Sequence, residues 1–363
     1  MTGAASASAA GRPPAVAAVT RARGRRVAVI AALAVLIVAV SLLSAAVGQF
    51  ALGPAEILAS LGRRLGLAPT TPDDLYADGA LWNVRFPRIV LGLIVGAALG
   101  VAGALMQGVF ANPLAEPAVV GVSAGAAVGA CAAIVFGLQT FGAATVPAAA
   151  FVMGIVTTLL VYVLSRAQGR TRVLMLVLTG VAVNAVANAV IALFVFLADT
   201  ASREQIMFWQ LGSLNGANWS AVAVTLPLLI VGVIGASLLA RRMDALALGD
   251  RSARHLGVPV ERVRLLAILL VALLTAAAVS FAGIIAFVGL IIPHLLRLLI
   301  GPAHAALLPA SALGGALLIG VADVVARTAV PFADLPIGMF TALVGGPVFF
   351  VLLRRTIATG ERA

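Results

Sequence analysis

The sequence contains no lysine, so all 24 of its basic residues are arginine. Nucleotide-binding loops of the G-x-x-x-x-G-K-[ST] type need a lysine to reach the phosphates of ATP. The chain therefore cannot carry a standard P-loop ATPase. If its activity is driven by ATP, the hydrolysis must occur on another protein.

Cysteine and histidine are also scarce. Cys131 is the single cysteine, which excludes an internal disulfide framework and a cysteine-based metal cluster. His294 follows Pro293, but no second histidine, cysteine or carboxylate stands at ligand spacing. Neither an H-E-x-x-H motif nor a pair of intramembrane aspartates is present, which argues against a membrane enzyme. We expect no metal, no cofactor and no catalytic residue.

Charge is sparse and apolar residues dominate. Only 10% of the 363 residues are charged, and 62% are hydrophobic. The apolar residues form blocks of about twenty, the length at which a helix crosses the hydrocarbon layer. Lipid offers no partners to exposed backbone groups, which favours helices, and the blocks are too long for a membrane barrel. We predict an all-α integral membrane protein.

Ten blocks qualify as transmembrane helices. Residues 1–26 are expected to be a disordered cytoplasmic segment, 27–355 a ten-helix transmembrane bundle, and 356–363 a cytoplasmic tail. The run from Val27 to Val47 is longer than the apolar core of a signal peptide, so an uncleaved helix is preferred, although Ser44-Ala45-Ala46 resembles a cleavage site. The predicted spans are 27–47, 88–107, 117–136, 146–165, 173–197, 220–240, 265–282, 284–299, 306–326 and 337–353.

Arginine placement predicts the orientation. With the amino terminus inside, the inner segments hold 18 arginines and the outer segments six. The positive-inside rule therefore places both termini in the cytoplasm of a cell-membrane protein. The net charge of +11 is explained by this distribution, and we expect no nucleic-acid partner. Glycines recur every four residues, which predicts close helix packing. The two series are Gly92, Gly96, Gly100, Ala104 and Gly108, in which an alanine fills one position, and Gly121, Gly125 and Gly129.

Several polar residues border or interrupt the spans. Arg85 and Arg88 flank Pro87 at the outer mouth, where Pro87 favours an extended Phe86 and a helix start. Asp323 and Arg327 stand four residues apart, so they can pair on one helix face. An ionisable residue inside a span is a functional candidate.

Two asparagines share a face of the fifth span. Asn184 and Asn188 are four residues apart, so both can line a pore or bond a neighbouring helix.

The longest polar stretch between spans on the inner side is 241–264. Apolar residues recur among its charges, and Gly249 and Gly257 break it. This pattern predicts two short amphipathic helices that dock a soluble partner, or alternatively lie on the lipid surface.

These segments also resemble a known family. RFPRIVLGLIVGAALGVAGALMQGVFANPLAEPAVVGVSAGAAVGA, from Arg85 to Ala130, is similar to the signature of FecCD permeases for iron chelates and vitamin B12. The later motifs also match in order across about 27–355. They are FWQLGSLNGANW, LGDRSARHLGV, GLIIPHLLR and DLPIGMFTALVGGPVFFVLLRR.

The resemblance implies a permease subunit of an ABC importer with several partners. These would be a second permease subunit (a second copy or a paralogue), two cytoplasmic ATPases and an extracytoplasmic substrate-binding protein. Arg85, Arg88 and Arg327 would dock the binding protein, and Asn184 and Asn188 would border the pathway. The segment from Leu248 would couple to the ATPase through Leu248, Gly249, Asp250, Ala253, Leu256 and Gly257.

The cargo implied is heme or a ferric siderophore, with heme preferred from 110–130 and 207–219. The alternatives are a vitamin B12 permease and an ion-coupled secondary carrier. The carrier is disfavoured because Asp323 is the only clear carboxylate within a span.

Overall fold

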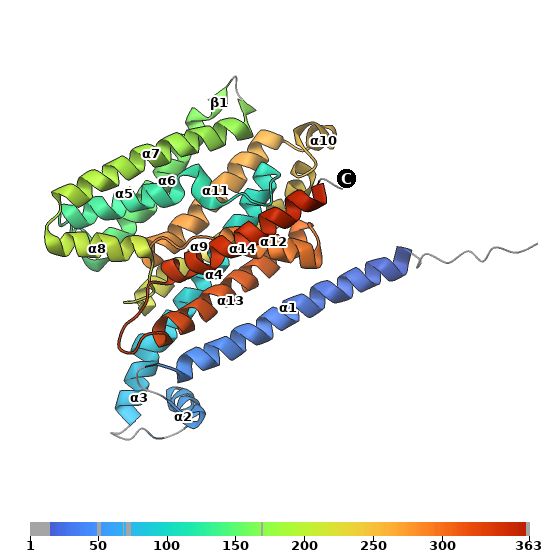
Figure 1. Ribbon diagram of the computed structural model, residues 1–363. Helices are drawn as coiled ribbons and strands as arrows, with labels where there is room; N and C mark the ends of the chain where they lie inside the picture. Colours follow the sequence, from blue (N-terminus) through green and yellow to red (C-terminus); the bar gives the residue numbers. More distant parts are fainter. Residues whose placement is uncertain (1–14, 49–51, 68, 70–73, 168–169, 361–363) are drawn as a thin grey trace, which may run out of the picture.

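The computed structural model describes residues 15–48, 52–67, 69, 74–167 and 170–360, and most of them lie in helices that form one bundle (Figure 1). The long helices run roughly along a common axis. They are α1 (Ala15–Ala46), α4 (Phe86–Phe110), α6 (Thr145–Leu164), α7 (Val173–Leu197), α9 (Trp219–Leu246), α11 (Val260–Ala282), α13 (His304–Thr328) and α14 (Ile337–Gly360).

The described helices confirm the predicted membrane-spanning architecture. Seven are long and apolar enough to cross a membrane, and three shorter apolar helices complete the series. The shorter ones are α5 (Val122–Val135), α12 (Val288–Ile300) and the first part of α14 (Ile337–Val351). Each of the ten predicted spans overlaps one of these helices. The nearly continuous apolar run after Leu265 divides at residues 283–287.

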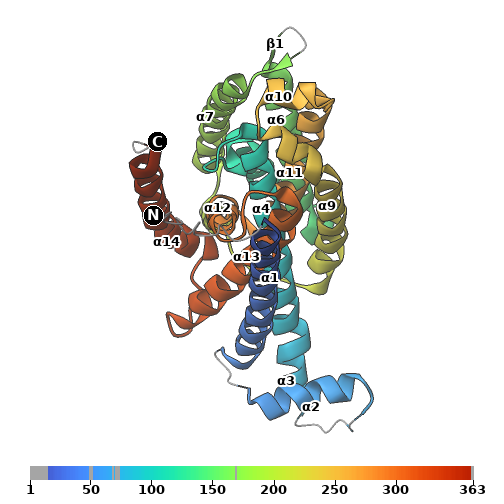
Figure 2. The ribbon, with the colours of Figure 1, turned by 90° about the vertical axis from the view of Figure 1, so that its right-hand side faces the viewer.

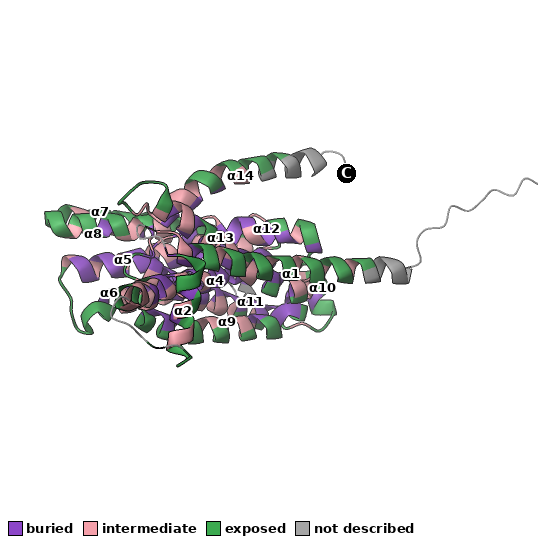
Figure 3. Ribbon diagram, turned by 90° about the horizontal axis from the view of Figure 1, so that it is seen from below, coloured by how far each residue is buried: buried purple, intermediate pink, exposed green. Residues whose placement is uncertain are grey.

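At both ends of the chain, the helices extend beyond the boundaries predicted from the sequence. The segment expected to be disordered, 1–26, is helical from Ala15, and residues 1–14 lie outside the described residues. Its alanines and arginines are strong helix formers, so the first span extends toward the amino terminus. At the other end α14 continues to Gly360. Much of α1 and α14 is exposed along the flank of the bundle (Figure 3).

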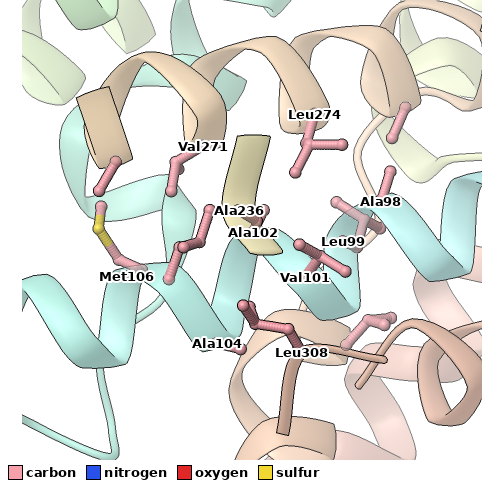
Figure 4. Packing of buried hydrophobic residues seen from close by; sticks show 14 of the residues in the cluster. Ala98, Leu99, Val101, Ala102, Ala104, Met106, Ala236, Val271, Leu274 and Leu308 are labelled. Atoms are coloured by element: carbon pink, nitrogen blue, oxygen red, sulfur yellow. The ribbon is translucent and has the colours of Figure 1, made fainter. Parts of the chain in front are cut away.

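Helix α4 lies at the centre of the core. It packs against α9, α11, α12 and α13, and Figure 4 shows its buried side chains meeting those of its neighbours. A Cβ atom at Gly96 would overlap the carbonyl group of Gly315, and one at Gly100 would overlap that of Ser311. The four-residue glycine spacing therefore allows the close helix contact that it predicted.

Short elements mark the two ends of the bundle. At one end are α2 (Pro54–Arg64) and α3 (Asp74–Ala80); at the other are α10 (Asp250–His255) and a hairpin of β1 (Arg166–Ala167) and β2 (Arg170–Thr171) (Figures 1 and 2). We refer to these as the α2–α3 end and the α10 end. The remaining elements are α8 (Thr200–Leu211), η1 (Leu81–Arg85), η2 (Pro117–Val120) and η3 (Gly142–Ala144).

Helix α4 begins beside Pro87 as expected, but the extended Phe86 is absent. Helix α3 continues through the π-helical η1 into α4, and Phe86 is helical with φ −64° and ψ −45° rather than extended. The π-helical turn shifts the hydrogen-bond register just before Pro87, which has no N–H to donate. As a result Arg85 ends the π-helix and Arg88 lies in the first turn of the following helix.

Two halves of the chain share an irregular feature. Helices α5 and α12 are both short, with 14 and 13 residues, and both start after a residue in the left-handed region. That residue is Gly121 in one half and Phe287 in the other, with φ of 79° and 67°. Glu116 joins the halves, because its Oε1 accepts the backbone N–H of Phe287 at 2.9 Å.

Candidate functional site

Four charged side chains form an ion-pair cluster near the α2–α3 end. Arg88 on α4 donates from Nε to Asp323 Oδ1 at 2.8 Å and from Nη1 to Asp334 Oδ2 at 2.6 Å. Arg327 Nε donates to Asp323 Oδ2 at 3.1 Å. The predicted Asp323–Arg327 pair is therefore confirmed, and it belongs to a network that joins α4, α13 and the loop before α14.

Arg327 of this cluster and the nearby Arg85 bind the end of α1. Arg327 Nη2 donates to the carbonyl oxygen of Ser44 at 3.1 Å and to its Oγ at 2.6 Å. Arg85 Nη1 donates to the carbonyl oxygen of Ala45. Backbone carbonyls at a helix end have no intrahelical partner, so guanidinium donors satisfy them here. Helix α1 is thus joined to the ion-pair cluster through Arg327.

The three arginines predicted to dock a binding protein lie together but are little exposed. Arg85 and Arg88 are each 7% exposed, and the Arg327 side chain is 9% exposed. All three border a pocket of about 270 Å³. Its lining residues are Gly48, Ala80, Val84, Arg85, Arg88, Asn215, Arg327 and Asp334. The pocket gathers three cations and one carboxylate.

The two asparagines proposed for the pathway differ in surroundings. Asn184 is half-buried, and its Nδ2 donates to the carbonyl oxygen of Ala118 at 3.2 Å. Asn188 is exposed on α7. The first asparagine therefore bonds a neighbouring element, as one interpretation of the sequence allowed, while the second lies on an open face.

The segment predicted to couple to an ATPase contains one separate short helix rather than two. Helix α9 runs on to Leu246, α10 follows, and α11 begins at Val260. The breaks fall at Gly249 and Gly257, with φ of 95° and 76°, where glycine is favoured. Leu248 and Leu256 are 68% and 65% exposed, whereas Ala253 is fully buried.

A buried arginine missed by the sequence analysis anchors this segment. Arg264 is 1% exposed, and its Nη2 donates to Asp250 Oδ1 at 2.7 Å. Its Nη1 donates to the carbonyl oxygen of Thr171 at 2.9 Å. Arg264 thus connects α10 to the hairpin that leads into α7. Its position three residues after Glu261, directly before an apolar run, is the sequence signal that marks it.

Asp334 was also missed as a partner of the arginine cluster. It stands immediately before a span at the same predicted side as Arg88. That placement is a usable signal, because a carboxylate beside a cluster of buried cations offsets their desolvation cost.

Comparison with known proteins places the chain among membrane permeases. A cobalamin import permease of Halobacterium salinarum is 43% identical over 274 residues, covering 75% of this chain and 72% of that protein. A hemin transport permease of Yersinia pestis is 38% identical over 304 residues, covering 80% and 89%. An iron(3+)-hydroxamate import permease of Bacillus subtilis is 37% identical over 284 residues, covering 76% and 83%.

A solved structure has the same fold. It is described as an inward-facing conformation of a putative metal-chelate type ABC transporter, and it superposes with a TM-score of 0.79 at 32% identity. The alignment covers 90% of this chain and 98% of that one. The FecCD transport family matches residues 35–355. This chain therefore belongs to the FecCD transport family of ABC transporter permeases.

Proposed function

We propose that this chain is the permease subunit of an ATP-driven importer for an iron chelate, with heme as the preferred cargo and a ferric siderophore as the next. A vitamin B12 importer is the alternative. The observation that carries the proposal is the family match over 35–355, together with similar proteins named as permeases for hemin, ferric hydroxamate and cobalamin.

Growth of a deletion strain tests the cargo. Iron-starved cells lacking the gene would be offered hemin, ferric siderophores or no chelate, and a cobalamin-dependent culture would be run in parallel. Rescue by the gene on hemin alone supports heme import. Rescue on a siderophore alone assigns siderophore import, and rescue only in the cobalamin-dependent culture assigns the alternative.

Two ATPase subunits are the proposed partners at the α10 end. The exposed Leu248 and Leu256 offer apolar anchors there, and Gly249 and Gly257 delimit the short helix between them. A change at α10 has a direct path to α7 through Arg264 and Thr171. ATP-driven closure of the partners would favour one arrangement of the bundle over the other. The α10 end and both termini would then lie in the cytoplasm.

A substrate-binding protein is the proposed partner at the α2–α3 end, through Arg85, Arg88 and Arg327. The pocket that these arginines border supports the proposal, since cations outnumber carboxylates there. Arg88 and Arg327 already pair internally, so acidic residues of a docking protein would compete with Asp323 and Asp334. Docking would thereby loosen the contact between α4 and α13.

A second permease subunit, identical or paralogous, is proposed along the open faces of α7 and α14. Both helices expose apolar side chains, including Val181, Phe196, Leu343 and Phe350 at 50–80%. Asn188 lies on the α7 face and would border the pathway between subunits, with Asn184 beside it.

Purification in mild detergent tests the partner assignment. A permease of this kind should retain an ATPase chain through purification, whereas an ion-coupled carrier should purify without one.

A further inference from the structure

A second and larger pocket lies at the α10 end, about 830 Å³ in volume. It is bordered by α1 at Arg26, by the ends of α4, α9 and α12, and by the segments on either side of α10. Its polar lining includes Arg26, Gln107, Asp244 and Arg297. Nothing in the proposed transport mechanism uses these four side chains together.

Arg297 borders this pocket, and two of its buried donors have no partner among the described residues. These donors are its Nε and Nη2 atoms. Nη1 makes only a long contact of 3.5 Å with the carbonyl oxygen of Pro302. A buried guanidinium left without partners is costly, so the geometry fits a site that an anion completes. Nε and Nη2 form the edge of the guanidinium that binds carboxylate or phosphate in a bidentate manner.

A second arginine reaches the same pocket from another helix. Arg26 on α1 donates from Nε to the carbonyl oxygen of Ile300 at 3.2 Å, which fixes it beside the end of α12. One oxygen of the pocket's carboxylate is engaged elsewhere, since Asp244 Oδ1 accepts the backbone N–H of His304 at 2.8 Å and contacts its Nδ1 at 2.6 Å. No ion pair within 4 Å joins Asp244 to Arg297 in the described chain. Two cations therefore face the cavity.

The surroundings of the arginines indicate where the anion comes from. Arg297 lies in the last turn of an apolar helix, and Arg26 directly precedes the apolar part of α1, so both stand where the hydrocarbon layer ends. Exposed apolar side chains adjoin them: Val27 is 61%, Leu298 is 66% and Leu299 is 52% exposed. A ligand here would have a phosphate beside apolar chains.

We propose that this pocket binds the phosphate group of an anionic phospholipid from the leaflet at the α10 end, with its acyl chains along α1 and α12. Basic pockets between transmembrane helices at a membrane surface suit such headgroups. The site is independent of the proposed cargo, but Leu248 and Leu256 of the proposed ATPase surface also line the pocket. Arg297 and Arg26 bind the phosphate, and Gln107 lines the inner wall of the pocket.

Native mass spectrometry of the detergent-purified full chain tests the proposal. The protein would be titrated with phosphatidylglycerol, with phosphatidylcholine and with inorganic phosphate. We expect one phosphatidylglycerol to bind tightly, with the Arg26→Gln and Arg297→Gln double variant binding it about thirtyfold more weakly, because each arginine contributes on the order of 1 kcal/mol.

The matched control is Arg172→Gln, an exposed arginine at the same end of the bundle, which should keep wild-type binding. Equal retention of phosphatidylglycerol and phosphatidylcholine would overturn the proposal, as would undiminished binding by the double variant. If inorganic phosphate binds and the lipid does not, the pocket is a free-phosphate site and the lipid proposal is overturned. Equal melting temperatures of the variants would exclude misfolding as the cause of lost binding.

Discussion

The two ends of the bundle use charge in opposite ways. At the α2–α3 end, Arg88 and Arg327 share Asp323 inside the protein, and little of this network is exposed. At the α10 end, Arg264 is buried against Asp250, but the neighbouring Leu248 and Leu256 are left exposed. One end pairs most of its charges within the protein, and the other presents exposed apolar side chains beside an anchored helix.

This difference indicates how each end can bind a partner. The two exposed leucines that flank the anchored helix α10 can bind a partner without rearrangement, because burying their side chains breaks no existing contact. A buried ion-pair cluster can bind a charged partner only by exchanging one carboxylate for another. We therefore expect docking at the α2–α3 end to be coupled to movement of α4 against α13, and docking at the α10 end to precede movement.

The largest expected effect breaks the internal cluster. Asp323→Ala removes the carboxylate shared by Arg88 and Arg327, which leaves two mostly buried cations with one remaining carboxylate, Asp334. Breaking a buried ion pair costs about 3–5 kcal/mol. We expect a lower melting temperature in detergent and a loss of folded protein.

The control for this change is Glu204→Ala, an exposed carboxylate on α8. It should melt like the wild type. An Asp323→Ala variant as stable as the Glu204→Ala variant would show that the cluster contributes nothing to packing.

The next largest effect is expected from a substitution that separates α10 from the hairpin. Arg264→Met keeps most of the side-chain volume but removes the donors to Asp250 and Thr171, at a cost of about 1.5–3 kcal/mol for hydrogen bonds of a charged group. With ATPase subunits bound, transport should fall more than ATPase assembly. Arg254→Met is the control, because Arg254 contacts the same Asp250 at 3.6 Å from an exposed position. Equal transport by both variants would contradict a connecting role for Arg264.

Sequence patterns predicted the helices well and the contacts between them poorly. Hydrophobic length alone locates the ten spans, because a membrane imposes the same requirement on each. The Asp323–Arg327 pair was predictable because both residues lie on one helix. Arg88 and Asp323 are 235 residues apart, and Arg264 and Thr171 are 93 apart, so no local spacing reveals either contact. The burial of the three docking candidates followed from these distant partners, and it was equally invisible.

A smaller effect tests the exposed anchors at the α10 end. Leu248→Asp with Leu256→Asp places charge on two side chains that contribute little to the fold, so stability should change by less than about 0.5 kcal/mol per site. Retention of an ATPase during purification should fall about tenfold, because apolar anchors carry much of the energy of an interface. Leu65→Asp is the control: it is 74% exposed at the opposite end. If both variants retain the ATPase equally, the anchors lie elsewhere.

The smallest effect sharpens the account of the α2–α3 end. Arg85 borders the pocket and donates to the carbonyl oxygen of Ala45. Arg85→Gln keeps a hydrogen-bond donor near the carbonyl oxygen of Ala45, so stability should fall much less than after Asp323→Ala. Binding-protein affinity should fall about threefold, and its dependence on salt should weaken, because one charge of the docking surface is gone.

Surface-binding measurements at two salt concentrations would check this, with Arg203→Gln as the control. Arg203 is exposed on α8 and donates to the carbonyl oxygens of Val195 and Phe196. A loss that is equal in the two variants would reflect the net charge of the whole face. A loss confined to Arg85→Gln would locate docking at the pocket. If neither variant changes the affinity, Arg85 serves only to hold α1, and the internal cluster alone accounts for the charges at this end.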